Sequence, residues 1–279
     1  MIITWLDHNM TTPETSSHLP DEVREKAIDY VASGAKAIAG AAPFVGSILA
    51  ELAGVVIPNQ RLDRIAKFAA ALEERIRNLE QADVRKSLHD EEFTDLLEGA
   101  LRQAARSTSD ERRGYLASLI ANSLSNETIE HAESKHLLRI LDELNDIEII
   151  WLRFYLRPGM GGDEDFRGKH QAVLARRQAF IGSSEEVLDK HALQESYQDH
   201  LIDLGLVTAH ISRDMRTGIP EFDRFTGEPK VSYHYISPLG KLLLRTIGIK
   251  DQELEKRQEA QQSAAPNAGS AGAPPASVS

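Results

Sequence analysis

Apolar residues recur at intervals of three and four along most of the chain between residues 61 and 157. This spacing places them on one face of an α-helix, because the helix has about 3.6 residues per turn. Charged residues occupy the other faces, and aromatic residues make up only 6% of the chain. Helices packed through aliphatic side chains therefore form the predicted core. The clearest stripe, in a helix predicted from about residue 61 to 81, consists of Leu62, Ile65, Ala69, Leu72, Ile76 and Leu79.

Capping residues predict where the following helices begin and end. One helix is expected over about 90–106, and the next begins near Thr108, which has capping-box spacing with Glu111. Asn145 and Glu148 have the same spacing inside the long apolar segment that follows. Asn145 therefore divides that segment into two helices. Pro158 and the glycines after it end the second of them.

Residues 40–58, with the sequence GAAPFVGSILAELAGVVIP, form the most apolar stretch of the chain. A helix is predicted before it, over about 21–39, and Pro43 separates that helix from a second one that ends near Ile57. Small residues recur at every fourth position on one face of the second helix, and bulky residues form another face. The small residues are Gly46, Ala50 and Gly54, and the bulky residues are Phe44, Ile48, Leu52 and Val55.

Two interpretations of this stretch remain open, namely burial and membrane insertion. A helix after Pro43 has about 15 residues and a length of about 22 Å, shorter than the bilayer's hydrocarbon core of about 30 Å. Glu51 near its centre would also cost roughly 2–3 kcal/mol in lipid. A buried hairpin or a contact between subunits is therefore the favoured interpretation, and membrane contact is the alternative. The seven residues of the two faces are the candidates for self-association or membrane contact.

The C-terminal part of the sequence has the element order of a winged helix. Helices are predicted over about 168–180 and 184–204, with Gly205 as the C-cap of the second. Two alternating segments, LVTAHIS and KVSYHYIS, predict a hairpin with a long tip, and a last helix starts at Pro238. The predicted fold class is thus mainly α, with an N-terminal helical bundle and a C-terminal winged-helix-like α+β unit.

The charges of this unit favour a protein partner over DNA. In a DNA-binding winged helix, the helix before the first strand enters the major groove. Here that helix reads LQESYQDHLIDLG and contains Glu195, Asp199 and Asp203 but no Lys or Arg. The formal net charge of −11 also opposes broad affinity for nucleic acid. The candidate partner-contact residues lie on the wing and are Arg213, Arg216 and Arg224.

These patterns divide the chain into four parts. Residues 1–20 are predicted to be an irregular lead-in, 21–160 a helical domain with the apolar hairpin, 161–250 the winged-helix-like domain, and 251–279 a disordered tail. The start of the chain lacks the basic and then apolar order of a signal peptide, which predicts a cytoplasmic protein. If residues 40–58 enter lipid, the expectation becomes peripheral association or insertion at the inner membrane.

No motif in the sequence predicts catalysis, a cofactor or a metal site. The chain has no cysteine, and its 10 histidines are scattered without an HExxH or similar ligand spacing. The glycines of GMGGDEDF follow a helix and precede acidic residues, so they lack the context and positive field of a phosphate-binding loop. There is also no GxSxG motif. We therefore expect a protein that is not an enzyme.

Two segments resemble the bacterial abortive-phage-infection family called Abi-alpha. The first runs from RSTSDERRGYLASLIANSLSN to HLLRILDELNDIEIIWLRFY and resembles the family at Leu119, Ala121, Asn122, Leu124, Ile140, Leu144, Asp146, Ile147, Ile149 and Leu152. The second, closing segment does so at Leu201, Leu204, Gly205, Leu206, Val207, Ser237, Leu239, Gly240 and Leu243. The resemblance covers about residues 60–247. It implies phage defence by abortive infection, in which an infected cell dies or stops growing, and it supplies no catalytic residues.

The expected function is therefore non-enzymatic anti-phage defence through protein–protein or membrane contact. A protein partner or self-association is expected, and nucleic acid is disfavoured. Two alternatives remain open. A membrane-perturbing effector would place residues 40–58 in lipid, whereas a winged-helix transcription regulator would bind DNA through the C-terminal unit.

Overall fold

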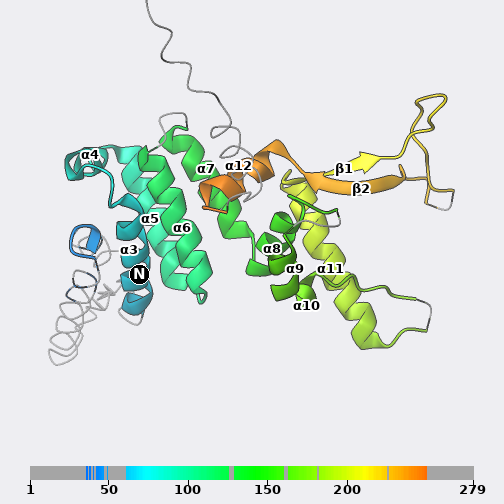
Figure 1. Cartoon of the computed structure of the whole chain (residues 1–279), viewed down its shortest axis with the longest axis horizontal. Coiled ribbons are helices and arrows are strands. Elements are labelled where there is room, and N and C mark those ends of the chain that lie inside the picture. Colours follow the sequence, from blue (N-terminus) through cyan, green and yellow to red (C-terminus); the bar gives the residue numbers. More distant parts are fainter. Residues whose placement is uncertain are drawn as a thin grey trace, which may run out of the picture.

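The computed structural model of this chain is mainly helical, with a small two-stranded sheet near the C-terminus (Figure 1). It describes residues 36, 38, 40, 42–46, 49, 61–125, 129–159, 163–180, 182–224 and 226–249. Some of the sequence predictions fall outside these residues. They are the lead-in 1–20, the first part of the helix over 21–39, the tail 251–279 and the candidate residues Ile48, Ala50, Leu52, Gly54 and Val55.

The helices between residues 62 and 143 form the predicted bundle. They are α3 (Leu62–Ile76), α4 (Gln81–Ser87), α5 (Glu91–Arg106), α6 (Asp110–Ser125) and α7 (His131–Glu143). The next helix, α8 (Asp146–Phe154), packs mainly against the helix Glu185–Asp203 of the C-terminal unit. α3 packs against α5 and α6, and α5 packs against α6 and α7. Their apolar stripes meet in one core of aliphatic side chains, to which Phe68, Phe93 and Trp151 add the largest buried rings. The predicted helix, however, extends to about residue 81, whereas α3 ends at Ile76 and α4, beginning at Gln81, is a separate helix.

The predicted capping box of Thr108 and Glu111 is wrong by one residue. α6 begins at Asp110, and the hydroxyl of Ser109 accepts the backbone N–H of Arg112 at 2.9 Å. Ser109 therefore caps the first turn of α6. Two neighbouring residues offer similar hydroxyl groups, and only the position of the first turn decides between them.

The second predicted capping box is confirmed at the start of α8. Asn145 Oδ1 accepts the backbone N–H of Glu148 at 2.9 Å, and Glu148 Oε2 accepts the backbone N–H of Asn145 at 2.7 Å. Two N–H groups that have no partner within the helix are thus satisfied by side chains. The break between α7 and α8 falls where the sequence places it.

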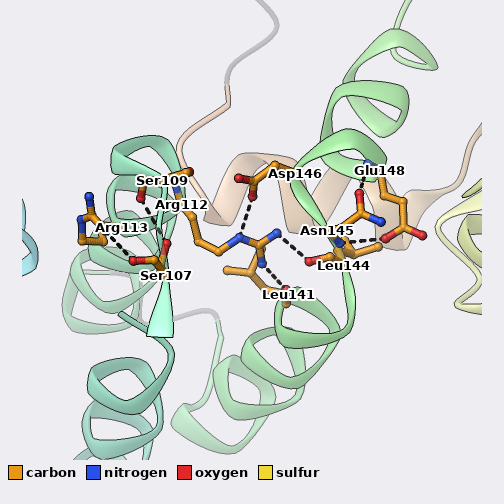
Figure 2. Close-up of polar contacts among 9 residues, drawn as sticks. All are labelled: Ser107, Ser109, Arg112, Arg113, Leu141, Leu144, Asn145, Asp146 and Glu148. Atoms are coloured by element: carbon orange, nitrogen blue, oxygen red, sulfur yellow. Dashed lines mark hydrogen bonds and ion pairs between the residues drawn. The ribbon is translucent and has the colours of Figure 1, made fainter. Parts of the chain in front are cut away.

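Arg112 joins α6 to this junction of α7 and α8 (Figure 2). Its guanidinium donates to Leu141 O at 2.8 Å and to Leu144 O at 2.5 Å. A third hydrogen bond reaches Asp146 Oδ1 at 2.8 Å. Carbonyls in the last turn of a helix lack intrahelical partners, so Arg112 completes the C-terminal end of α7. Its side chain is only 13% exposed.

The described part of the apolar stretch packs on the bundle. Ala42, Val45 and Leu49 are buried in the same core as α3. Glu73 of α3 accepts the backbone N–H groups of Phe44 and Val45, each at 3.1 Å. This carboxylate therefore supplies partners to the first free N–H groups of the short helical turn after Pro43.

Two of the candidate self-association residues, Phe44 and Gly46, lie in this described part. Gly46 is buried, and Phe44 is half-buried with the guanidinium of Arg85 5.6 Å from its ring centroid. Among the residues that the structure describes, no helix combines the length and the apolar character needed to cross a bilayer.

The C-terminal unit has the predicted order of helix, strand, strand and helix. Its elements are α9 (Glu164–Lys169), α10 (Gln171–Leu174), α11 (Glu185–Asp203), β1 (Val207–Ile211), β2 (Val231–Ile236) and α12 (Pro238–Thr246). The strands pair antiparallel, with Val207 opposite Ile236. Gly205 follows α11 at φ 69°, as expected for a C-cap. The helix predicted over 168–180 instead divides at His170, whose backbone is not helical, and residues 175–180 lie outside any helix.

Polar contacts attach the C-terminal unit to the bundle and to α8. Asn122 Nδ2 of α6 donates to Thr246 O at the end of α12, at 2.7 Å. His200 Nδ1 of α11 lies 2.8 Å from Glu148 Oε1 of α8, and Glu148 is buried. With the unit held in this way, the hairpin of β1 and β2 projects away from the bundle (Figure 1).

Candidate functional site

The large apolar side chains that remain exposed lie in the C-terminal unit. They are Phe180, Val187, Leu188, Leu193, Met215, Ile219, Phe222, Val231, Tyr233 and Tyr235. Within the described chain, none of this set belongs to the helices α3 to α8. Isolated exposed apolar residues are normal on a protein surface, whereas a concentration of them marks a contact surface. A contact surface is therefore expected on the hairpin or on α11.

The long connection between β1 and β2 folds into two short arms, which we call the fork (residues 212–230). Each arm is closed by an antiparallel bridge, and the bridges are Arg213–Pro220 and Phe222–Pro229. Between the arms, Glu221 N donates to Ser212 O at 2.9 Å and Lys230 N donates to Glu221 O at 2.8 Å. These bonds hold both arms on a common base, beyond which they diverge (Figure 1).

Both arms have the same sequence pattern, Asp-x-x-Thr-Gly-x-Pro, at residues 214–220 and 223–229. Asp214 Oδ1 accepts the backbone N–H of Thr217 at 2.7 Å, and Asp223 Oδ1 accepts that of Thr226 at 3.0 Å. The glycine after each threonine lies at positive φ, 70° in one arm and 73° in the other, where a side chain is disfavoured. The repeat could have indicated from the sequence that the tip of the hairpin forms two similar turns. The alternation of the strands by itself predicts only that the tip is long.

The predicted contact residues Arg213, Arg216 and Arg224 are all exposed on the fork. Arg213 Nη1 donates to Gly218 O at 3.1 Å, so this side chain belongs partly to the first arm. In the part of the chain that the structure describes, the guanidiniums of Arg216 and Arg224 have no hydrogen-bond or ion-pair partner. One such guanidinium is therefore available on each arm.

Three of the four acidic side chains of the fork, all but Glu228, are engaged within its described part. Asp214 Oδ1 accepts the backbone N–H of Arg216 at 2.9 Å in addition to its bond within the turn. Glu221 Oε2 accepts the hydroxyl hydrogen of Ser212 at 2.8 Å. Asp223 Oδ1 accepts the backbone N–H of Thr226 in the second arm. Each arm therefore presents one available guanidinium, that of Arg216 next in sequence to the fully exposed Met215 and that of Arg224 on the second arm. The four acidic residues of the fork balance its four basic residues in total charge.

The turn hydrogen bonds hold the pKa of Asp214 below its ordinary value, first through the backbone N–H and hydroxyl of Thr217 and then through the N–H of Arg216. Because the pKa is lower in the folded state, the carboxylate stabilises the arm at neutral pH. That contribution is lost as the pH falls through the folded-state pKa. We expect the amide resonances of Arg216 and Thr217 to shift together in an acid NMR titration, with a midpoint below that of free aspartate, about 3.9. A midpoint at or above that of free aspartate would contradict the turn geometry.

An aromatic strip, formed by His210, Tyr233 and Tyr235, continues the exposed surface along the hairpin. His210 and Tyr233 stack with their ring centroids 4.6 Å apart and their planes 6° apart. The ring of Tyr235 lies 6.2 Å from that of Tyr233. The segments 206–212 and 231–237 contain no Asp, Glu, Lys or Arg. Because Tyr, Met and Arg are enriched in protein interfaces, the fork and the aromatic strip together form the candidate site.

Polar groups in the bundle take part in structural contacts. His131 Nδ1 lies 2.8 Å from Ser123 Oγ, and its ring packs against Phe93 with centroids 5.2 Å apart. A shallow groove of about 500 Å³ between α5 and α7 is lined by charged side chains that pair with one another, including Lys135 with Asp95 at 2.5 Å. Over the described residues, no cluster of His, Asp and Glu is arranged to hold a metal ion.

Comparison of this chain with protein-family models, curated proteins and solved structures finds no match. Polar residues on which the resemblance to Abi-alpha rests have structural contacts. Asn122 binds the end of α12, and Asp146 binds Arg112. Ser237 caps α12 by accepting the N–H of Gly240 at 3.0 Å and donates its hydroxyl hydrogen to Gly205 O at 2.6 Å. The resembling segments therefore build the scaffold that carries the hairpin.

Proposed function

We propose that this chain is a non-enzymatic anti-phage defence protein that acts by binding another protein molecule through its fork and aromatic strip. The observation that carries the proposal is the composition of this exposed surface. The fork offers available guanidiniums and an exposed Met side chain, and the adjoining strands offer exposed Tyr side chains. Arg and Tyr often dominate the binding energy of protein interfaces, and Met is enriched in them.

The defence part of the proposal rests on the resemblance to Abi-alpha. The non-enzymatic part is supported by the buried and partly buried polar side chains, which make structural hydrogen bonds. Arg112, Glu148 and Asn122 each bind a neighbouring helix or its end. These contacts hold helices in place. Two of them fix α11 and α12, the helices on either side of the hairpin.

A protein partner suits this surface better than DNA. The helix that would enter the major groove, α11, exposes Glu195, Asp199 and Asp203. These carboxylates would repel phosphates. A membrane-perturbing role is also less well supported, because Ala42, Val45 and Leu49 would have to leave the bundle core before the apolar stretch could enter lipid.

The proposal is tested by plating phages on bacteria that carry the gene under its own promoter. With part of a broad phage panel, these cells are expected to give fewer or smaller plaques than cells without the gene. Infected cultures should stop growing before phage is released. Unchanged plaque number and size over the whole panel would remove the defence proposal.

A further inference from the structure

The first half of α11 is largely exposed, with His191 and Gln194 half-buried, although a helix of this length normally buries one face. α11 has 19 residues, and Leu201, close to its end, is the residue that it buries. Residues 185–190 are all exposed. The exposed apolar side chains Val187, Leu188 and Leu193 belong to this half. The start of α11 lies away from both the bundle and the fork (Figure 1).

One face of this half combines acidic and apolar side chains. Glu185, Leu188, Asp189 and Ala192 follow one another at intervals of three, one and three residues, so they lie side by side on the helix surface. All four are exposed. Within the described chain, neither Glu185 nor Asp189 forms an ion pair. We call these four residues the acidic face of α11.

The fork carries the complementary chemistry. It presents the available guanidiniums of Arg216 and Arg224, one on each arm, and the exposed side chain of Met215 on the same arm as Arg216. The acidic face presents carboxylates beside Leu188. Contact between the two surfaces would pair opposite charges at a rim and bury apolar side chains between them, which is the usual arrangement in a protein interface.

We propose that the fork of one copy of this chain binds the acidic face of α11 in a second copy. This inference rests on the proposed function and names the partner of the same site, a second copy of the chain. The two surfaces differ, so the contact is head-to-tail. Each bound copy still offers a free fork or a free acidic face, and further copies therefore add to form a ring or an open chain.

The experiment is a charge exchange followed by sedimentation velocity of the purified full chain. The fork variant carries Arg216→Glu and Arg224→Glu, and the helix variant carries Glu185→Lys and Asp189→Lys. The wild-type sedimentation coefficient should rise with concentration up to about 100 µM, the range in which weak protein contacts are populated. Each variant alone should stay at the monomer value, because like charges now meet in the contact.

An equimolar mixture of the two variants decides whether these two surfaces meet each other. The reversed fork of one variant then faces the reversed helix of the other, and the unchanged fork of the second faces the unchanged helix of the first. Association is therefore restored, with the two variants alternating in the ring or chain. Restored association also shows that both variants are folded. A wild-type chain that stays monomeric, or variants that associate like wild type, would overturn the proposal, and so would a mixture that stays monomeric. If the chain stays monomeric while protection against phage still depends on the fork, the proposed function stands and its partner is a different protein.

Discussion

Gly240→Ala is expected to destabilise the chain by about 3 kcal/mol or more, the upper range for forcing an extra carbon into a packed site. A Cβ at residue 240 would lie 2.3 Å from Leu206 O and 2.8 Å from Ile236 Cγ1. α12 cannot easily move away, because its start is fixed by Ser237 and its end by Asn122. The gain in helix propensity from Gly to Ala, about 1 kcal/mol, is too small to offset this overlap.

Urea unfolding followed by circular dichroism measures the effect, and Gly168→Ala is the matched control. Gly168 is also helical, but nothing lies within 4 Å of the position its Cβ would take. The control should unfold at the same or a slightly higher urea concentration than wild type, because Ala favours the helix. Equal midpoints for Gly240→Ala and wild type would show that α12 does not pack on the hairpin as described.

Arg112→Met is expected to lower the free energy of unfolding by about 2–4 kcal/mol, because it leaves partly buried acceptors without donors. Methionine retains much of the apolar stem of arginine but none of its hydrogen bonds. The carbonyls of Leu141 and Leu144 and the carboxylate of Asp146 would each lose a donor (Figure 2). The end of α7 and the start of α8 should therefore loosen together.

Hydrogen exchange of the amides in α7 and α8 reports this loosening directly, alongside urea unfolding. Arg102→Met serves as the control, because Arg102 is 54% exposed and its ion pair among the described residues is with Glu98, one turn away. Removing such a surface pair should change stability by no more than about 0.5 kcal/mol. If both substitutions had the same small effect, Arg112 would be an ordinary surface residue and its assigned role would be wrong.

The helical fold could be predicted from the sequence wherever local signals decide the structure. Spacing of apolar residues predicts the bundle helices, and the Asn145 capping box places the break before α8 correctly. Local signals fail where two residues compete or where distant contacts decide. Thr108 and Ser109 both offer a hydroxyl group, and His170 carries no helix-breaking signal at the point where α9 ends.

Contacts between distant segments explain what the sequence could not predict. The hydrogen bond from Asn122 to Thr246 joins residues that are 124 positions apart in the sequence. No spacing rule relates two such residues. The wing arginines were predictable as exposed residues from their neighbours. The sequence does not predict that the guanidinium of Arg216 stays unpaired among the described residues. Asp214, the nearest acid in the sequence, instead accepts backbone N–H groups of its own turn.

The most direct test of the central claim measures phage plating on cells that carry Arg216→Glu and Arg224→Glu. The matched control is Lys86→Glu with Arg139→Glu, which makes the same change in net charge at exposed positions of the bundle. Expression and folding of both variants are checked by immunoblot and circular dichroism. We expect the fork variant to lose protection and the control to keep it. Full protection by the fork variant would show that the fork is not the surface through which the protein acts.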